Sequence, residues 1–267
     1  MTKPILVTGG TGTLGRAVVE RLLAAGREVR VLSRRPAPAA GAPPYTWMTG
    51  DLRTGEGIDP AVAGVDGIIH CASGPRGDVE AARCLIEAAR RAGNPHLIYI
   101  SIVGVDRVPL GYYRAKLDVE RLIESSGLPW TMLRATQFHD LILRGCAMLA
   151  RLPVMPVPAG TSFQPIEVCE VANRLVELST APPAGRVPDM GGPEIRSTGD
   201  LARSYLRAAD RHRRVLPVPI PGAIFSAYRA GGHLAPDRAA GRLTFEEFLA
   251  ERVIPAPGSD TKTGRPS

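Results

Sequence analysis

The sequence predicts an α/β fold with a doubly wound parallel sheet and a smaller C-terminal elaboration. Up to about residue 135, short β-branched runs alternate with helical segments of roughly ten to fifteen residues, a pattern typical of a parallel sheet covered on both faces. A glycine-rich turn also joins the first β-branched run to the first helical segment. With 44% hydrophobic residues, the 267-residue chain can bury the core that such a sheet needs.

The first half of the chain is expected to supply the sheet and most of its covering helices. β-branched and apolar runs predict strands at residues 5–9, 29–33, 45–52, 67–73, 97–101 and 130–135. Apolar residues at helical spacing, such as Ala82, Leu85 and Ala89, predict the helices between them. These helices are expected at residues 16–25, 78–92 and 112–126.

The second half is irregular and proline-rich, but helices can still be recognised in it. One is expected at residues 170–178, and Ser197 or Thr198 is expected to cap another that runs to about residue 209. Thr244 and Glu247 have the spacing of a capping box that opens a last helix. We therefore expect a core at residues 1–135, an elaboration at 136–254 that is interleaved with the core, and a disordered tail at 255–267.

The basic character of the chain does not by itself identify a nucleic-acid partner. The formal net charge is +7, but the arginines are scattered, and the sequence has no recognition-helix motif and no interleaving of aromatic with basic residues. The tightest cluster, Arg211, Arg213 and Arg214, is interpreted as a solvated helix end. We expect no nucleic-acid partner.

Other classes of site also lack their sequence patterns. The five histidines show no metal-ligand spacing, so no metal is expected, and the GxSxG pattern of a nucleophilic serine is missing. The four cysteines form no CxxC pair, which predicts reduced thiols in a cytoplasmic protein. No apolar stretch has the length of a signal peptide or a membrane span, so no membrane association is expected.

The strongest motif is TGGTGTLG at residues 8–15, which closes the first strand and opens the first helix. Glycines at 9, 12 and 15 permit a tight turn and let the backbone approach a pyrophosphate, which then rests on the positive end of the helix. The motif predicts a Rossmann-type, dinucleotide-binding core. The contacting residues are expected to be Gly9, Thr11, Gly12, Thr13, Leu14 and Gly15.

The end of the second strand favours NADPH over NADH. An NAD site usually has Asp or Glu there to bind the ribose hydroxyls, but this strand ends in Ser33, Arg34 and Arg35. Guanidinium groups bind a 2′-phosphate, which a carboxylate would repel. His70, at the end of the fourth strand, is expected to be packed or hydrogen-bonded. Asp51 and Leu52, after the third strand, are expected to contact the adenine, and further cofactor contacts are expected from Cys71, Ala72 and Ser73.

Lysine is rare in this arginine-rich chain, and Lys116 is the one lysine far from both ends of the sequence. In YYRAK it follows Tyr112 by four residues, so both side chains project from one face of a helix. A nearby ammonium would lower the pKa of the phenol, and the same ammonium could bind the nicotinamide ribose. Tyr112 is therefore predicted as an acid-base group, whereas Tyr113 is interpreted as packing.

These motifs together resemble the atypical branch of the short-chain dehydrogenase/reductase superfamily, the NmrA-like and isoflavone-reductase-like NAD(P)H-binding proteins. LPWTMLRATQFHD (128–140) and SFQPIEVCEVA (162–172) strengthen the resemblance, which covers nearly all of residues 4–254. It implies that Tyr112 acts as general acid and that Lys116 orients the cofactor. It also implies that Thr136 lies beside the cofactor and that substrate is contacted by Gln137, Phe138 and His139.

One position departs from the pattern of this superfamily. Members with a full catalytic triad have a serine or threonine shortly after the fifth strand, within a run of small hydroxyl residues. Here Ser101 is the one hydroxyl residue, and it falls before the expected position. Either Ser101 serves as the catalytic hydroxyl, or the triad is incomplete.

Three functions remain open from the sequence. The favoured one is an NADPH-dependent reductase that transfers hydride to a carbonyl, quinone or enone of a small apolar or aromatic substrate. Its pocket would also be lined by Phe163, Gln164 and residues 216–228. The first alternative is a non-catalytic NAD(P)-sensing regulator, which alone would need a protein partner. The second is an epimerase or dehydratase that holds its cofactor tightly.

Overall fold

The computed structural model describes residues 3–37, 41, 43–74 and 76–253. The tail predicted to be disordered, at 255–267, lies outside the described residues. Within them, no helix combines the length and the apolar character needed to cross a bilayer. The cytoplasmic location stays a prediction.

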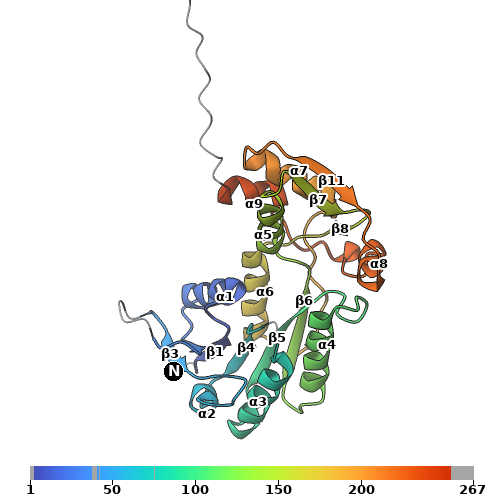
Figure 1. Ribbon diagram of the computed structural model, residues 1–267. Helices are drawn as coiled ribbons and strands as arrows, with labels where there is room; N and C mark the ends of the chain where they lie inside the picture. Colours follow the sequence, from blue (N-terminus) through green and yellow to red (C-terminus); the bar gives the residue numbers. More distant parts are fainter. Residues whose placement is uncertain (1–2, 38–40, 42, 75, 254–267) are drawn as a thin grey trace, which may run out of the picture.

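A seven-stranded parallel sheet forms the centre of the molecule, in the order β3-β2-β1-β4-β5-β6-β9 (Figure 1). The predicted doubly wound α/β fold is thus confirmed. The six expected strands are present, although β3 and β4 end earlier than predicted. The strands are β1 (Ile5–Thr8), β2 (Val29–Ser33), β3 (Thr46–Thr49), β4 (Gly67–His70), β5 (His96–Ile102), β6 (Trp130–Ala135) and β9 (Gly185–Arg186).

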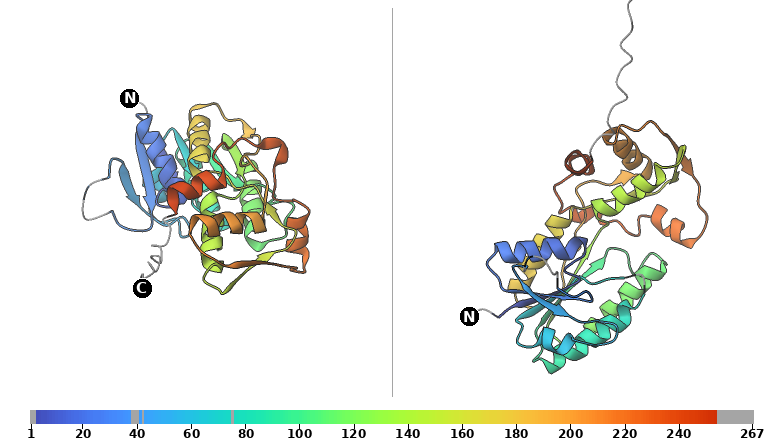
Figure 2. Two further views of the ribbon diagram at one scale, coloured as in Figure 1. Left: turned by 90° about the horizontal axis from the view of Figure 1, so that it is seen from above. Right: turned by 60° about the vertical axis from the view of Figure 1, so that its left-hand side comes forward.

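Helices cover both faces of the sheet, as the two views of Figure 2 show. On one face, α1 (Thr13–Ala24) packs against α6 (Val168–Thr180), and Val18, Leu22 and Leu175 are fully buried in the core between them. On the other face lie α2 (Ile58–Val62), α3 (Asp78–Arg91) and α4 (Gly111–Glu124). Because α6 and β9 come from the second half of the chain, that half returns to the core.

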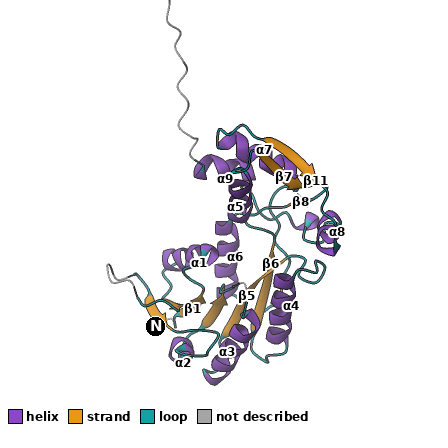
Figure 3. Ribbon diagram, viewed as in Figure 1, coloured by secondary structure: helices purple, strands orange, loops and turns teal. Residues whose placement is uncertain are grey.

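The remaining elements form a smaller lobe at one end of the sheet (Figure 3). The predicted caps are present: Ser197 accepts from the backbone of Asp200, and Thr244 and Glu247 form a capping box. The lobe contains α5 (His139–Leu149), β7 (Val154–Pro158), β8 (Ser162–Phe163), β10 (Arg196–Ser197), α7 (Thr198–Ala208), β11 (Arg214–Val218), α8 (Ala223–Arg229), a 3₁₀ turn (Pro236–Arg238) and α9 (Phe245–Arg252). Its apolar core is separate from the two cores of the sheet.

Candidate active site

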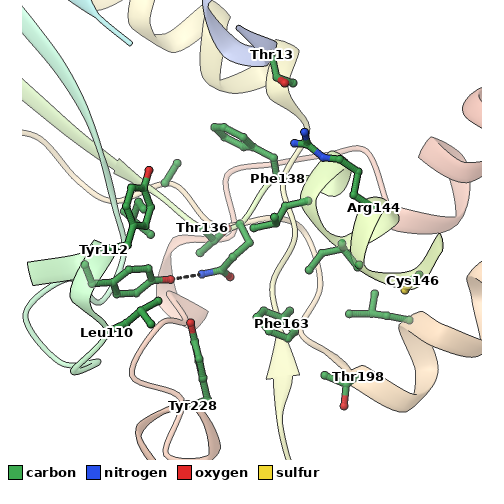
Figure 4. A pocket seen from close by; sticks show the side chains of 18 of the residues that line it. Thr13, Leu110, Tyr112, Thr136, Phe138, Arg144, Cys146, Phe163, Thr198 and Tyr228 are labelled. Carbon is green, nitrogen blue, oxygen red and sulfur yellow. Dashed lines mark hydrogen bonds between the residues drawn. The ribbon is translucent and has the colours of Figure 1, made fainter. Parts of the chain in front are cut away.

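A cavity of about 790 Å³ lies between the carboxyl ends of the strands and the smaller lobe (Figure 4). Thr13 at the start of α1 and Arg144 of α5 lie toward one end of it, and Thr198 and Tyr228 lie toward the other. Many of the residues predicted for cofactor, substrate and catalysis line this one space. They are Gly12, Thr13, Leu14, Cys71, Ser73, Ser101, Tyr112, Lys116, Thr136, Gln137 and Phe138.

The glycine-rich turn has the geometry that a dinucleotide pyrophosphate needs. Gly9 has a positive φ of 69°, and a Cβ there would lie 2.6 Å from the backbone nitrogen of Ala72. A Cβ on Gly15 would collide with the carbonyl oxygen of Gly9, so the turn and α1 pack backbone to backbone. Gly12 caps α1 without a side-chain hydrogen bond, which leaves the first backbone N–H groups of α1 open. These donors fit an anionic group.

The end of β2 presents two cationic side chains. Arg34 and Arg35 are exposed, and within the described part of the chain neither is paired with a carboxylate. Local hydrogen bonds hold the backbone: Arg35 N donates to Ser33 Oγ over 3.1 Å, and Trp47 Nε1 donates to the Arg35 carbonyl over 3.0 Å. Both guanidinium groups are therefore available for a 2′-phosphate.

The two residues predicted to contact adenine are occupied locally. Asp51 Oδ1 accepts from the backbone N–H of Arg53 over 2.9 Å, and Leu52 packs against the core under the sheet. Both lie just beyond β3, outside the cavity. A role at the adenine end of a cofactor stays a prediction.

Tyr112 forms a hydrogen-bond chain that the sequence did not predict. Its hydroxyl lies 2.8 Å from Ser73 Oγ, and Ser73 donates to Asp78 Oδ2, also over 2.8 Å. Because Ser73 uses its single hydroxyl hydrogen on Asp78, Tyr112 must be the donor to Ser73. Asp78 also accepts from the backbone N–H of Gly74, which fixes the carboxylate at the start of α3.

Lys116 does not lower the pKa of Tyr112 as expected. Burial raises the pKa of Tyr112, and Asp78 adds to this effect while the hydrogen bond with Ser73 opposes it. Lys116 itself is only 3% exposed, and burial lowers its pKa to about 8 against the opposing effect of Asp78. The expectation that Lys116 lowers the pKa of Tyr112 is therefore wrong, and Tyr112 keeps its proton at neutral pH.

The Lys116 ammonium has few partners of its own. Its Nζ lies 3.4 Å from the carbonyl oxygen of Ile100 and 4.8 Å from the centre of the Tyr99 ring. A buried ammonium has three hydrogens to donate, and one long hydrogen bond leaves it incompletely satisfied. This arrangement fits a group that also binds ribose hydroxyls at the cavity wall.

Ser101 does not complete a triad with Tyr112 and Lys116 in this structure. It is 2% exposed, and its Oγ has no hydrogen-bond partner among the described residues. The hydroxyl that does contact Tyr112 belongs to Ser73, on the neighbouring strand end. His70, by contrast, behaves as predicted, because its Nδ1 lies 2.7 Å from Thr8 Oγ1 in a buried pair.

Two residues predicted to contact substrate are structural instead. His139 is fully buried, stacks on Phe245 and Phe248, and lies 3.0 Å through Nε2 from the carbonyl oxygen of Leu243. It therefore packs α5 against α9. Gln164 is buried as well: its Nε2 donates to carbonyl oxygens on the two chain segments at Gly192 and Ala235. Neither residue lines the cavity.

The sequence analysis missed two other contributions to the cavity. Tyr113, interpreted there as packing, lines the cavity and accepts a hydrogen bond from Gln137 Nε2 over 3.1 Å, the dashed line in Figure 4. Helix α5 forms a wall because it is apolar on more than one face, a signal that was present in its sequence. The wall residues are Leu141, Ile142, Arg144, Gly145, Cys146 and Leu149.

Comparison with known protein families agrees with this geometry. The model of a family described as NAD(P)H-binding matches residues 9–146, more than half of the chain. This chain belongs to the NAD(P)H-binding family. The resemblance to NmrA-like, atypical short-chain dehydrogenase/reductases is thereby confirmed, and so is the prediction of an NAD(P)H cofactor.

Relatives of this NAD(P)H-binding protein include enzymes and assembly factors. It is 30% identical to quinone oxidoreductase 2 of Escherichia coli over 216 residues. The aligned region covers 78% of this chain and 75% of that protein. It is 25% identical to photosystem II assembly factor Ycf39 of Trieres chinensis over 266 residues. The aligned region covers 92% of this chain and 81% of that protein. The solved NADPH complex of quinone oxidoreductase QOR2 from Escherichia coli has the same fold, with a TM-score of 0.81, 20% identity and coverage of 92% and 99%.

The pKa of Lys116 predicts a pH-dependent affinity for the cofactor. The ammonium is present below a pH of about 8 and is lost as the pH rises through that value. Since a charge-assisted hydrogen bond is roughly 1 kcal/mol stronger than a neutral one, the Kd for NADPH should rise about fivefold between about pH 7 and pH 9.5. Fluorescence titration of NADPH across this range measures the slope. Lys116→Met should flatten it, and an equally steep slope in that variant would assign the pH dependence to another group.

Proposed function

We propose that this protein is an NADPH-dependent reductase that acts on a carbonyl, quinone or enone of a small apolar or aromatic substrate. The observation that carries the proposal is the shared cavity, in which the start of α1 and an apolar chamber border one continuous space. The 30% identity to a quinone oxidoreductase supports the same class of reaction. When bound, NADPH supplies the hydride.

The side chains of this protein have separate tasks in the proposed reaction. Lys116 binds the ribose next to the reacting ring. Tyr112, whose pKa is raised by burial, keeps its proton at neutral pH and donates it to the substrate oxygen. To accept this proton, the substrate oxygen would replace Ser73 as the hydrogen-bond acceptor of Tyr112. Apolar side chains such as Phe138, Leu149 and Met155 exclude water from the reacting centre.

The proposal is tested by anaerobic oxidation of NADPH with a panel of quinones, enones and aromatic ketones, followed by the absorbance of the reduced nicotinamide. Turnover should depend on the acceptor and should be faster with NADPH than with NADH at equal concentration. Oxidation of NADPH that is independent of every acceptor in the panel would contradict the proposal.

A redox-sensing regulator is a second candidate function. Two observations favour it: the Oγ of Ser101 makes no hydrogen bond to Tyr112, and the hydroxyl hydrogen of Tyr112 is already donated to Ser73. The similarity to an assembly factor supports a role through a protein partner. Tight binding of NADPH together with no turnover across the whole panel would decide for this candidate.

The preference for NADPH is assigned to the end of β2. We expect the double variant Arg34→Ala/Arg35→Ala to raise the Kd for NADPH about tenfold and to leave the Kd for NADH nearly unchanged, because charge-assisted hydrogen bonds to the 2′-phosphate are lost. The matched control is Arg211→Ala/Arg213→Ala, which removes the same charge from exposed positions after α7. An equal change in the Kd for NADPH in both double variants would reduce the effect to net charge.

A further inference from the structure

A short row of polar groups interrupts the mainly apolar wall of the substrate chamber. Gln137 follows β6, Tyr113 belongs to α4 and Tyr228 belongs to α8, and all three side chains line the cavity. Gln137 Nε2 donates to the Tyr113 hydroxyl over 3.1 Å. In Figure 4 the hydroxyl of Tyr228 points toward this hydrogen bond from the other side.

The direction of these hydrogen bonds leaves a donor facing the chamber. Because Tyr113 accepts from Gln137, its own hydrogen is free to be donated onward. Burial raises the pKa of both Tyr113 and Tyr228, so both phenols keep their protons at neutral pH. Within the described part of the chain, neither phenol hydrogen has an acceptor, so both can be donated to a ligand in the chamber.

The surroundings make these hydroxyls poor candidates for simple packing. Tyr113 is only 4% exposed and Gln137 only 7%, and the Oε1 atom of Gln137 has no hydrogen-bond partner in the described part of the chain. A buried polar group without a partner costs free energy that an apolar side chain of similar shape would avoid. The chamber nearby is built from apolar residues such as Phe163, which offer an oxygen atom no hydrogen bond.

We propose that Tyr113 and Tyr228, supported by Gln137, bind the acceptor oxygen of the substrate and so select apolar ring compounds that carry a carbonyl oxygen. This inference rests on the proposed reductase function and deepens it. The two tyrosines supply the positioning hydrogen bonds that Ser101 does not supply, and Tyr112 remains the proton donor. Their hydroxyls thus determine which ligand binds and how it is oriented.

The test compares two ligands that differ in one oxygen atom, 1-tetralone and tetralin. Their Kd values are measured by equilibrium dialysis in the presence of NADP⁺, so that no hydride transfer takes place. The ratio of the Kd of tetralin to that of tetralone should fall about tenfold in Tyr113→Phe/Tyr228→Phe relative to wild type, with the Kd of tetralin unchanged. Comparing this ratio between proteins cancels the cost of desolvating the ketone.

Tyr205→Phe is the matched control, because Tyr205 is a buried tyrosine of the smaller lobe that does not line the cavity. It should leave the ratio at the wild-type value. An unchanged ratio in the double variant, or equal weakening of both ligands, would overturn the inference. Binding is measured without turnover, so the test also works if the protein reduces no substrate. In that case, a tenfold lower Kd ratio in the double variant would still support the oxygen-binding site, and only the reductase proposal would be rejected.

Discussion

Tyr112→Phe should lower kcat for a ketone or enone about a hundredfold and leave the Kd for NADPH nearly unchanged. A positioned general acid typically contributes this much, and phenylalanine removes the donated proton while keeping the ring. Tyr112 lines the cavity and is 37% exposed, so the substitution should cost little stability. Steady-state kinetics with saturating NADPH measures the effect.

A second variant separates proton donation from local structure. Ser73→Ala removes the acceptor that holds the Tyr112 hydrogen but leaves the phenol in place, so kcat should change far less than in Tyr112→Phe. Equal losses in the two variants would mean that the chain from Tyr112 to Asp78 acts as one structural unit. An unchanged kcat in Tyr112→Phe would remove the proton-donor role from this residue.

Arg134→Met should reduce the free energy of unfolding by about 3 to 5 kcal/mol, since it leaves a buried carboxylate without its partner. Arg134 of β6 is 4% exposed and forms a two-pronged ion pair with Glu120 of α4, at 2.8 and 2.5 Å. It also donates to Asp106, in the segment before α4, over 3.0 Å. Urea unfolding of both proteins at neutral pH measures the difference.

The ion pair anchors the helix that carries Tyr112, Tyr113 and Lys116, so its loss should also weaken NADPH binding. Replacing both partners, as in Arg134→Met/Glu120→Leu, should restore most of the stability, because no buried charge is left uncompensated. If the free energy of unfolding of Arg134→Met falls by less than about 1 kcal/mol, water must reach Glu120, and the ion pair is not shielded from solvent.

The sequence predicted the parts of the site that depend on local pattern. The glycine turn at residues 8–15 and the helical spacing of Tyr112 and Lys116 are visible in the sequence alone, and the structure brings them to one cavity. The parallel sheet also follows from the alternation of strands and helices. The structure ends β4 at His70, before the predicted limit at residue 73.

The parts that failed depend on contacts between distant segments. Ser73 meets Tyr112 across 39 residues, and Gln164 meets Ala235 across 71, so no local pattern marks either contact. His139 was expected to contact substrate together with its neighbour Phe138. Its side chain instead packs against Phe248 of α9, on the side of α5 that faces away from the cavity. The pKa of Tyr112 was mispredicted because burial, which the sequence does not give, raises it, and the hydrogen bond that opposes this rise comes from Ser73 and not from Lys116.

In the proposed reductase, one cavity brings the cofactor and a carbonyl-bearing substrate into direct contact. The most direct measurement uses NADPH that carries deuterium at the transferring position, with an aromatic ketone or an enone as acceptor and mass spectrometry of the product. We expect the label on the reduced carbon of the product, because the hydride passes directly within the cavity. A reduced product without deuterium, or no product from a protein that binds NADPH tightly, would contradict it.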